Sequence, residues 1–120
     1  MKYPKIGNIE LNGWACLAPM AGVSDLAYRV IAKKMGASLT TAEMVSAKGL
    51  YYKNEKTKEM LKIAPDEHPM ALQLFGSDPD IMAWGAKIME QAGPDFIDIN
   101  MGCPMPVSYT HLTLPTTPYV

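Results

Sequence analysis

Short apolar runs alternate with segments of helical periodicity through the first hundred residues of the chain. The runs cover residues 13–18, 38–44, 71–75 and 96–100. Runs this short and continuous are typical of strands buried on both faces of a parallel sheet. Their alternation with helices predicts right-handed βα units in an α/β fold. This pattern fits either a doubly wound sheet or part of an eight-stranded barrel, and no internal repeat decides between the two.

Capping residues bound two of the three expected helices. The caps are Ser24 or Asp25 and Gly36 for the first helix, and Asp78-Pro79 and Gly93 for the third. Ser and Asp accept hydrogen bonds from the first amides of a helix, and Gly adopts the left-handed conformation that ends one. The sequence therefore predicts helices over about 25–35 and 79–92.

The second expected helix, over residues 48–62, has less sequence support. Glu55, Lys58, Glu59 and Lys62 are spaced so that they can pair along a helix surface. We expect these charges to form a solvated helix face. Because the whole chain carries a net charge of −1, its charge balance predicts no strong RNA-binding surface of its own.

Length and composition favour one soluble unit. The chain has 120 residues, 48% of them hydrophobic, which suffices for one modest core. No apolar run approaches the roughly 18 residues of a membrane span, and no hydrophobic signal segment follows Met1. We therefore expect a cytoplasmic protein without a membrane partner.

The two cysteines have separate explanations. Cys16 and Cys103 are far apart in sequence, and neither has a cysteine or histidine at metal-ligand spacing. We expect no metal site and no disulfide framework. Cys16 lies in the middle of an apolar run, which predicts a core residue without chemistry.

Residues that could bind a ligand gather where the expected strands end. They are Pro19-Met20-Ala21-Gly22, Glu43-Met44, Gln73, Asn100 and Cys103. In parallel βα folds the loops that leave the carboxyl ends of the strands share one face, so these residues should converge. Backbone amides, a side-chain amide and a thiol suit a planar ligand. No Ser/His/Asp arrangement, Walker A motif or Gly-x-Gly-x-x-Gly motif is found.

Four ordered motifs then give a specific resemblance. They are Ala18-Pro19-Met20-Ala21-Gly22-Val23-Ser24-Asp25, Glu43-Met44-Val45-Ser46, Gln73-Leu74-Phe75-Gly76-Ser77 and Asp98-Ile99-Asn100-Met101-Gly102-Cys103-Pro104. In this order and spacing the chain resembles the bacterial tRNA-dihydrouridine synthases. The resemblance implies an oxidoreductase with a (β/α)8 TIM barrel that holds FMN, and a helical domain that helps bind tRNA. It also implies NADPH as the reductant and uridine in tRNA as the substrate.

The resemblance assigns roles to six residues. It implies that Pro19, Met20 and Ala21 touch the flavin and that Gln73 binds its ring edge. It further implies that Cys103 is the general acid of the reduction. The least constrained role is that of Asn100, which is expected to face the uracil.

The chain departs from the family pattern after Pro106. Residues 107–120 are rich in Thr and Pro, where a fourth helix should begin. We expect residues 1–106 to be a partial FMN-binding catalytic domain, the N-terminal half of a truncated barrel. We expect residues 107–120 to be a tail foreign to the family, artefactual or disordered, and the chain to be inactive alone.

Two alternatives stay open at this point. One is a flavin dehydrogenase of the dihydropyrimidine or dihydroorotate type, which acts on free bases. The other is a non-catalytic half-barrel that serves as an assembly module.

Overall fold

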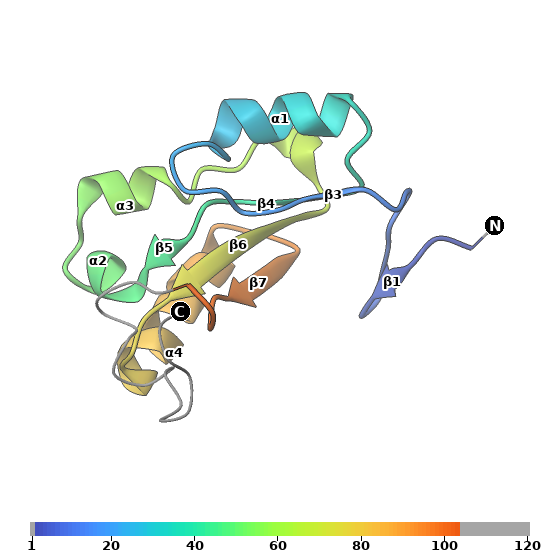
Figure 1. The fold of residues 1–120 in the computed structure, drawn as a ribbon. Coiled ribbons are helices and arrows are strands. Elements are labelled where there is room, and N and C mark those ends of the chain that lie inside the picture. The colour runs from blue at the N-terminus through green and yellow to red at the C-terminus, as the bar shows by residue number, and fades with distance from the viewer. Residues whose placement is uncertain (1, 104–120) are drawn as a thin grey trace, which may run out of the picture.

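A parallel β-sheet with helices packed against it forms the body of the protein (Figure 1). The computed structural model describes residues 2–103. The sheet contains β3 (Cys16–Leu17), β4 (Leu39–Thr41), β5 (Val45–Ser46), β6 (Met70–Phe75) and β7 (Phe96–Ile99). The helices are α1 (Leu26–Lys34), α2 (Ala47–Tyr51), α3 (Glu55–Glu59), the 3-10 turn η1 (Pro65–Glu67) and α4 (Pro79–Gln91). A separate antiparallel hairpin, β1 (Lys5–Ile6) and β2 (Ile9–Glu10), precedes the sheet.

β4 and β5 both pair with the same edge of β6, so together they occupy one position in the sheet. With β4 and β5 counted as one, the strand positions follow one another across the sheet in chain order. Thr41 is opposite Ala71, and Val45 is opposite Leu74. Four steps along one strand therefore face three steps along the other, which is the signature of a β-bulge. The positions β3, β4–β5, β6 and β7 are all parallel, so the predicted α/β sheet is confirmed.

The predicted caps of the first and third helices are confirmed. The Asp25 carboxylate accepts from the Tyr28 amide at 2.8 Å, and Gly36 has a φ of 104° after the end of α1. The Asp78 carboxylate accepts from the second and third amides of α4, and Gly93 has a φ of 85° after it. These short-range signals place the helices that follow β3 and β6.

The single helix predicted over residues 48–62 is wrong, because the segment forms α2 and α3 with a turn between them. Lys53 has a φ of 56°, which ends α2 in the left-handed region. Asn54 then caps α3 by accepting from the Thr57 amide at 3.1 Å. The expected surface pairs do form, since Lys58 contacts Glu55 at 2.7 Å and Lys62 contacts Glu59 at 2.9 Å.

The core lies between β6 and α4. All six residues of β6 are buried, and Met70, Leu72 and Leu74 belong to the same apolar cluster as Met89 of α4. Because side chains alternate along a strand, Ala71, Gln73 and Phe75 project to the opposite face. The amide of Gln73 is thus placed on the face of the sheet away from α4.

The first strand is shorter and less buried than the sequence predicts. Only Cys16–Leu17 pair as β3, and within residues 2–103 β3 is an edge strand of the sheet. Cys16 is exposed, with its Sγ 3.7 Å from the Ser38 Oγ, so its assignment to the core is wrong. An apolar run predicts a strand but does not show whether a neighbour covers it.

A buried ion pair fixes α1 to the segment before β6. Arg29 Nη2 lies 3.1 Å from Glu67 Oε1, and both side chains are at most 2% exposed. Arg29 also donates to the carbonyls of Ser24 and Lys62, so the N–H groups of the guanidinium have hydrogen-bond partners.

Within the described residues no helix is long and apolar enough to cross a membrane. The stretch 107–120, expected to be foreign to the family, lies outside those residues.

Candidate active site at the carboxyl ends of the strands

The loop after β3 is a tight turn held by its own residues. The Val23 amide donates to the Met20 carbonyl at 3.0 Å, and Gly22 has a φ of 73°. A turn with positive φ at its third position favours Gly, because a side chain there would be strained. Ser24 is fully buried and binds both the amide and the carbonyl of Met20, at 2.8 and 3.1 Å. The Pro19-Met20-Ala21-Gly22 segment is therefore a turn with a fixed backbone.

Glu43 connects this turn to the next strand position. Its Oε2 accepts a hydrogen bond from the Gly22 amide at 2.5 Å. Glu43 belongs to the bulge between β4 and β5, as does the next residue, Met44. The extra residue lets both side chains reach the strand ends, where regular alternation would send one of them to the opposite face.

The amides of Gln73 and Asn100 form the centre of the site. Gln73 is 6% exposed, and its Nε2 donates to Asp98 Oδ2 at 2.5 Å. Its Oε1 accepts from Asn100 Nδ2 at 3.1 Å. The same Nδ2 lies 3.7 Å from the Met44 sulfur, which is a weak acceptor. Both polar atoms of Gln73 are thus held by residues of β7 and its following loop.

Asn100 also shapes the turn that carries Cys103. Its Oδ1 accepts from the Gly102 amide at 3.1 Å and from the Cys103 amide at 2.8 Å. An Asn side chain that accepts from backbone amides two and three residues ahead fixes the local turn that those residues form. The half-buried Cys103 is therefore positioned by the residue that binds Gln73.

The contacts link all four strand positions, as the sequence predicts. Gly22 bonds to Glu43, Met44 contacts Asn100, and Asn100 joins Gln73 to the Cys103 turn. Pro19 and Ala21 lie in the turn, and their hydrocarbon side chains take no part in this hydrogen-bond network. The sequence did not assign roles to Glu43, Met44 or Asp98. For Glu43 and Met44, the available signal was their place at a strand end.

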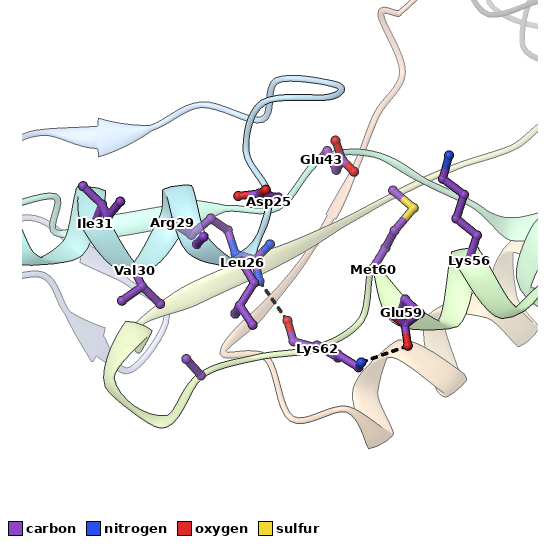
Figure 2. A pocket seen from close by; sticks show the side chains of 12 residues that line it. Asp25, Leu26, Arg29, Val30, Ile31, Glu43, Lys56, Glu59, Met60 and Lys62 are labelled. Atoms are coloured by element: carbon purple, nitrogen blue, oxygen red, sulfur yellow. Dashed lines mark hydrogen bonds and ion pairs between the residues drawn. The ribbon is translucent and has the colours of Figure 1, made fainter.

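A cavity among the described residues lies elsewhere. It has a volume of about 750 Å³ and lies between α1 and the α3 region (Figure 2). Leu26, Val30 and Met60 line it, with Glu43 at one side, but none of the six predicted site residues does. Figure 2 shows charged side chains of both signs around it, including the paired Glu59 and Lys62. The residues predicted to take part in the reaction lie at the strand ends and not at this cavity.

Parallel βα units with polar side chains gathered at the carboxyl edge define the α/β class in which ligands bind at that edge. Within this class the chain belongs to the dihydrouridine synthase family, because the family model "Dihydrouridine synthase (Dus)" matches residues 16–112. This result confirms the family resemblance of the four motifs.

Curated relatives agree with the family model. A "Probable tRNA-dihydrouridine synthase" of Treponema pallidum is 46% identical over 102 residues, which are 84% of this chain and 30% of the relative. A protein with the same description from Rickettsia prowazekii is 41% identical over 101 residues, 83% of this chain and 31% of the relative. The "tRNA-dihydrouridine synthase B" of Vibrio parahaemolyticus is 39% identical over 100 residues, with the same two shares. The chain thus spans about a third of the length of these relatives.

Proposed function

We propose that this chain provides part of an enzyme that reduces uridine in tRNA to 5,6-dihydrouridine, with FMN as cofactor and NADPH as reductant. Its four strand positions would be the first four of a (β/α)8 barrel. The phosphate-binding loops of such barrels usually follow strands seven and eight. For that reason we also propose that these residues alone are inactive.

The observation that carries this proposal is the Gln73–Asn100–Cys103 network. It places a buried amide, a second amide and a thiol at one edge of the sheet, to which the Pro19-Met20-Ala21 turn also leads. This donor set fits the polar edge and flat face of a flavin ring. Gln73 would bind the ring edge, and the Pro19-Met20-Ala21 turn would contact the ring. When bound, FMN would supply the hydride that adds to C6 of the uracil.

Cys103 would supply the proton that this reduction requires at C5. A positioned acid contributes roughly 10²–10⁴-fold to such a step. Asn100 would hold Cys103 in place through the two backbone amides that it binds. One of its N–H groups meets only the weak Met44 acceptor, so a uracil carbonyl could take that place at little cost. Because a stacked base cannot reach a thiol in the barrel mouth, the uridine would have to turn out of the tRNA.

A chimera tests this function in a complete barrel. Residues 16–103 of this chain would replace the aligned segment of the Treponema pallidum relative. We expect the purified chimera to retain FMN, seen by its absorbance, and to form dihydrouridine in an unmodified tRNA transcript when NADPH is added. Gln73→Leu, which keeps the volume but removes the amide, should lower the FMN content. A folded chimera that retains no FMN would refute the proposal.

A further inference from the structure

Positive charge is concentrated in one short part of the chain. Residues 48–62 contain five of its 11 basic residues and two of its 12 acidic residues, so this segment carries +3. The net charge of the chain is −1, so all the other residues together carry −4. A segment of opposite sign to the rest of the molecule is an electrostatic signal for an anionic partner.

The structure shows which of these lysines are available to such a partner. Lys58 and Lys62 pair with Glu55 and Glu59, which neutralises both acids of the segment. Lys48, Lys53 and Lys56 are exposed, and within residues 2–103 none of the three forms an ion pair. Figure 2 shows Lys56 apart from the Glu59–Lys62 pair. The excess charge of the segment therefore belongs to these three side chains.

Two aromatic rings accompany the three lysines. Tyr52 is 74% exposed and Tyr51 is 49% exposed. The Tyr51 ring is held edge-on against Tyr52 and against Trp84 of α4, with centroids 5.4 Å apart in each case. This packing makes Tyr51 a rigid support and leaves the more exposed Tyr52 for another flat group.

The position of this surface relates it to the candidate active site. The helix α2 begins immediately after β5, at the carboxyl edge of the sheet, and Figure 1 shows it just beyond the β5 arrow. Nucleic-acid interfaces bury about 1,000–2,500 Å² of protein surface, far more than one base in a pocket can cover. A tRNA with its uridine at Cys103 would have to contact surfaces around that edge.

We propose that Lys48, Lys53, Lys56 and Tyr52 form a tRNA-contacting surface, called here the α2–α3 surface. The lysines bind phosphates next to the reacting nucleotide, and Tyr52 stacks on an unpaired base. This inference rests on the proposed function, since it takes tRNA as the substrate. It differs from the expectation of a merely solvated helix face, because the exposure of Tyr52 beside these lysines is visible only in the structure.

A charge-matched comparison tests the surface in the 120-residue chain. The test variant is Lys48→Gln/Lys53→Asn/Lys56→Gln, in which Asn suits the left-handed backbone at position 53. The control is Lys2→Gln/Lys5→Gln/Lys34→Gln, which removes the same charge from other exposed lysines. Binding of a labelled, unmodified tRNA transcript would be followed by fluorescence anisotropy between 50 and 200 mM KCl, roughly the range in which phosphate contacts respond to salt.

We expect the test variant to bind roughly tenfold or more weakly than the unchanged chain, with a salt slope smaller by about 2 to 3. The control should change far less. Tyr52→Ala should weaken binding about tenfold, whereas Tyr52→Phe should not, because Phe still stacks. Equal losses in the two triple variants, an unchanged salt slope, or no tRNA binding at 50 mM KCl would overturn the proposal.

The readout also separates this inference from the proposed reaction. Binding is measured without FMN or NADPH, so it is independent of catalysis. A chimera without dihydrouridine activity would refute the proposed reaction. A selective loss of tRNA binding in the test variant would still support the α2–α3 surface. If the chimera is active but all variants of the 120-residue chain bind tRNA equally, only the α2–α3 surface is refuted.

Discussion

At the scale of the residue, Asn100 has the most partners in the candidate site. Its Oδ1 holds the Cys103 turn and its Nδ2 holds Gln73, so the two atoms have separable tasks. Asn100→Asp keeps the acceptor for the turn but loses the donor to Gln73. Asn100→Ala loses both.

In the chimera we expect Asn100→Ala to lower kcat for dihydrouridine formation about 10²-fold, within the range of a displaced general acid. Asn100→Asp should recover part of kcat, because the Cys103 turn persists, but should bind FMN less well than the unchanged chimera. Single-turnover rates and FMN titration measure the two effects. Equal kcat for Asp and Ala would show that the turn does not depend on the Asn100 oxygen.

Lys33 gives the chain a pH dependence outside the site. Burial lowers the pKa of this lysine from its ordinary 10.5, and the nearby charges of Asp95, Cys16 and Glu67 only partly oppose the shift. Its Nζ donates to the carbonyls of Ser38 and Pro69, at 2.7 and 3.2 Å. The folded state therefore releases this proton at a lower pH than the unfolded chain does.

Because the unfolded chain binds more protons in that window, the free energy of unfolding should rise with pH there. The window begins at the lowered pKa of Lys33 and ends near 10.5. Urea denaturation at a series of alkaline pH values would be compared between the unchanged chain and Lys33→Met. For each protein, the free energy of unfolding is plotted against pH, and the difference between the two slopes is the rise attributable to Lys33. Identical slopes would contradict this prediction.

At the scale of the element, the junction of α2 and α3 depends on a close approach at Gly49. A Cβ at Gly49 would lie 2.7 Å from Thr57 Oγ1 and 3.3 Å from its Cγ2. Gly49→Ala should destabilise the chain by about 1–3 kcal/mol, although Ala is the better helix former. Adding Thr57→Ala removes the two Thr57 atoms, leaves only the Ser46 Cβ at 3.3 Å, and should restore much of the loss. Urea denaturation of the unchanged chain and the two variants measures this, and a stabilising Gly49→Ala alone would contradict the packing.

Elements with strong local signals could be predicted, and those decided by other parts of the chain could not. Asp25, Asp78, Gly36 and Gly93 bound their helices through contacts within a few residues, which a sequence reveals. The break at Lys53 was not predictable, because a non-Gly residue seldom adopts positive φ. The bulge before Val45 depends on register with β6, which no local pattern contains.

At the scale of the whole molecule, the parallel order of the strands made the convergence of the candidate residues predictable. Gln73, Asn100 and Cys103 are brought together because carboxyl ends of parallel strands share an edge, and the structure confirms this convergence. The link from Glu43 to Gly22 needed the actual register and loop conformation. Cys16 was misassigned because burial of a strand depends on its neighbours in the sheet, not on its own composition.

We propose that Cys103 is the proton donor of a uridine reduction, and the second cysteine of the chain provides the control for this role. In the chimera of residues 16–103 with the Treponema pallidum relative, Cys103→Ala and Cys16→Ala would be compared for dihydrouridine formed per FMN with NADPH and unmodified tRNA. We expect Cys103→Ala to be slower by about 10²–10⁴-fold with unchanged FMN content. Cys16→Ala should react at nearly the unchanged rate. Full activity in Cys103→Ala, or equal losses in both variants, would contradict the claim.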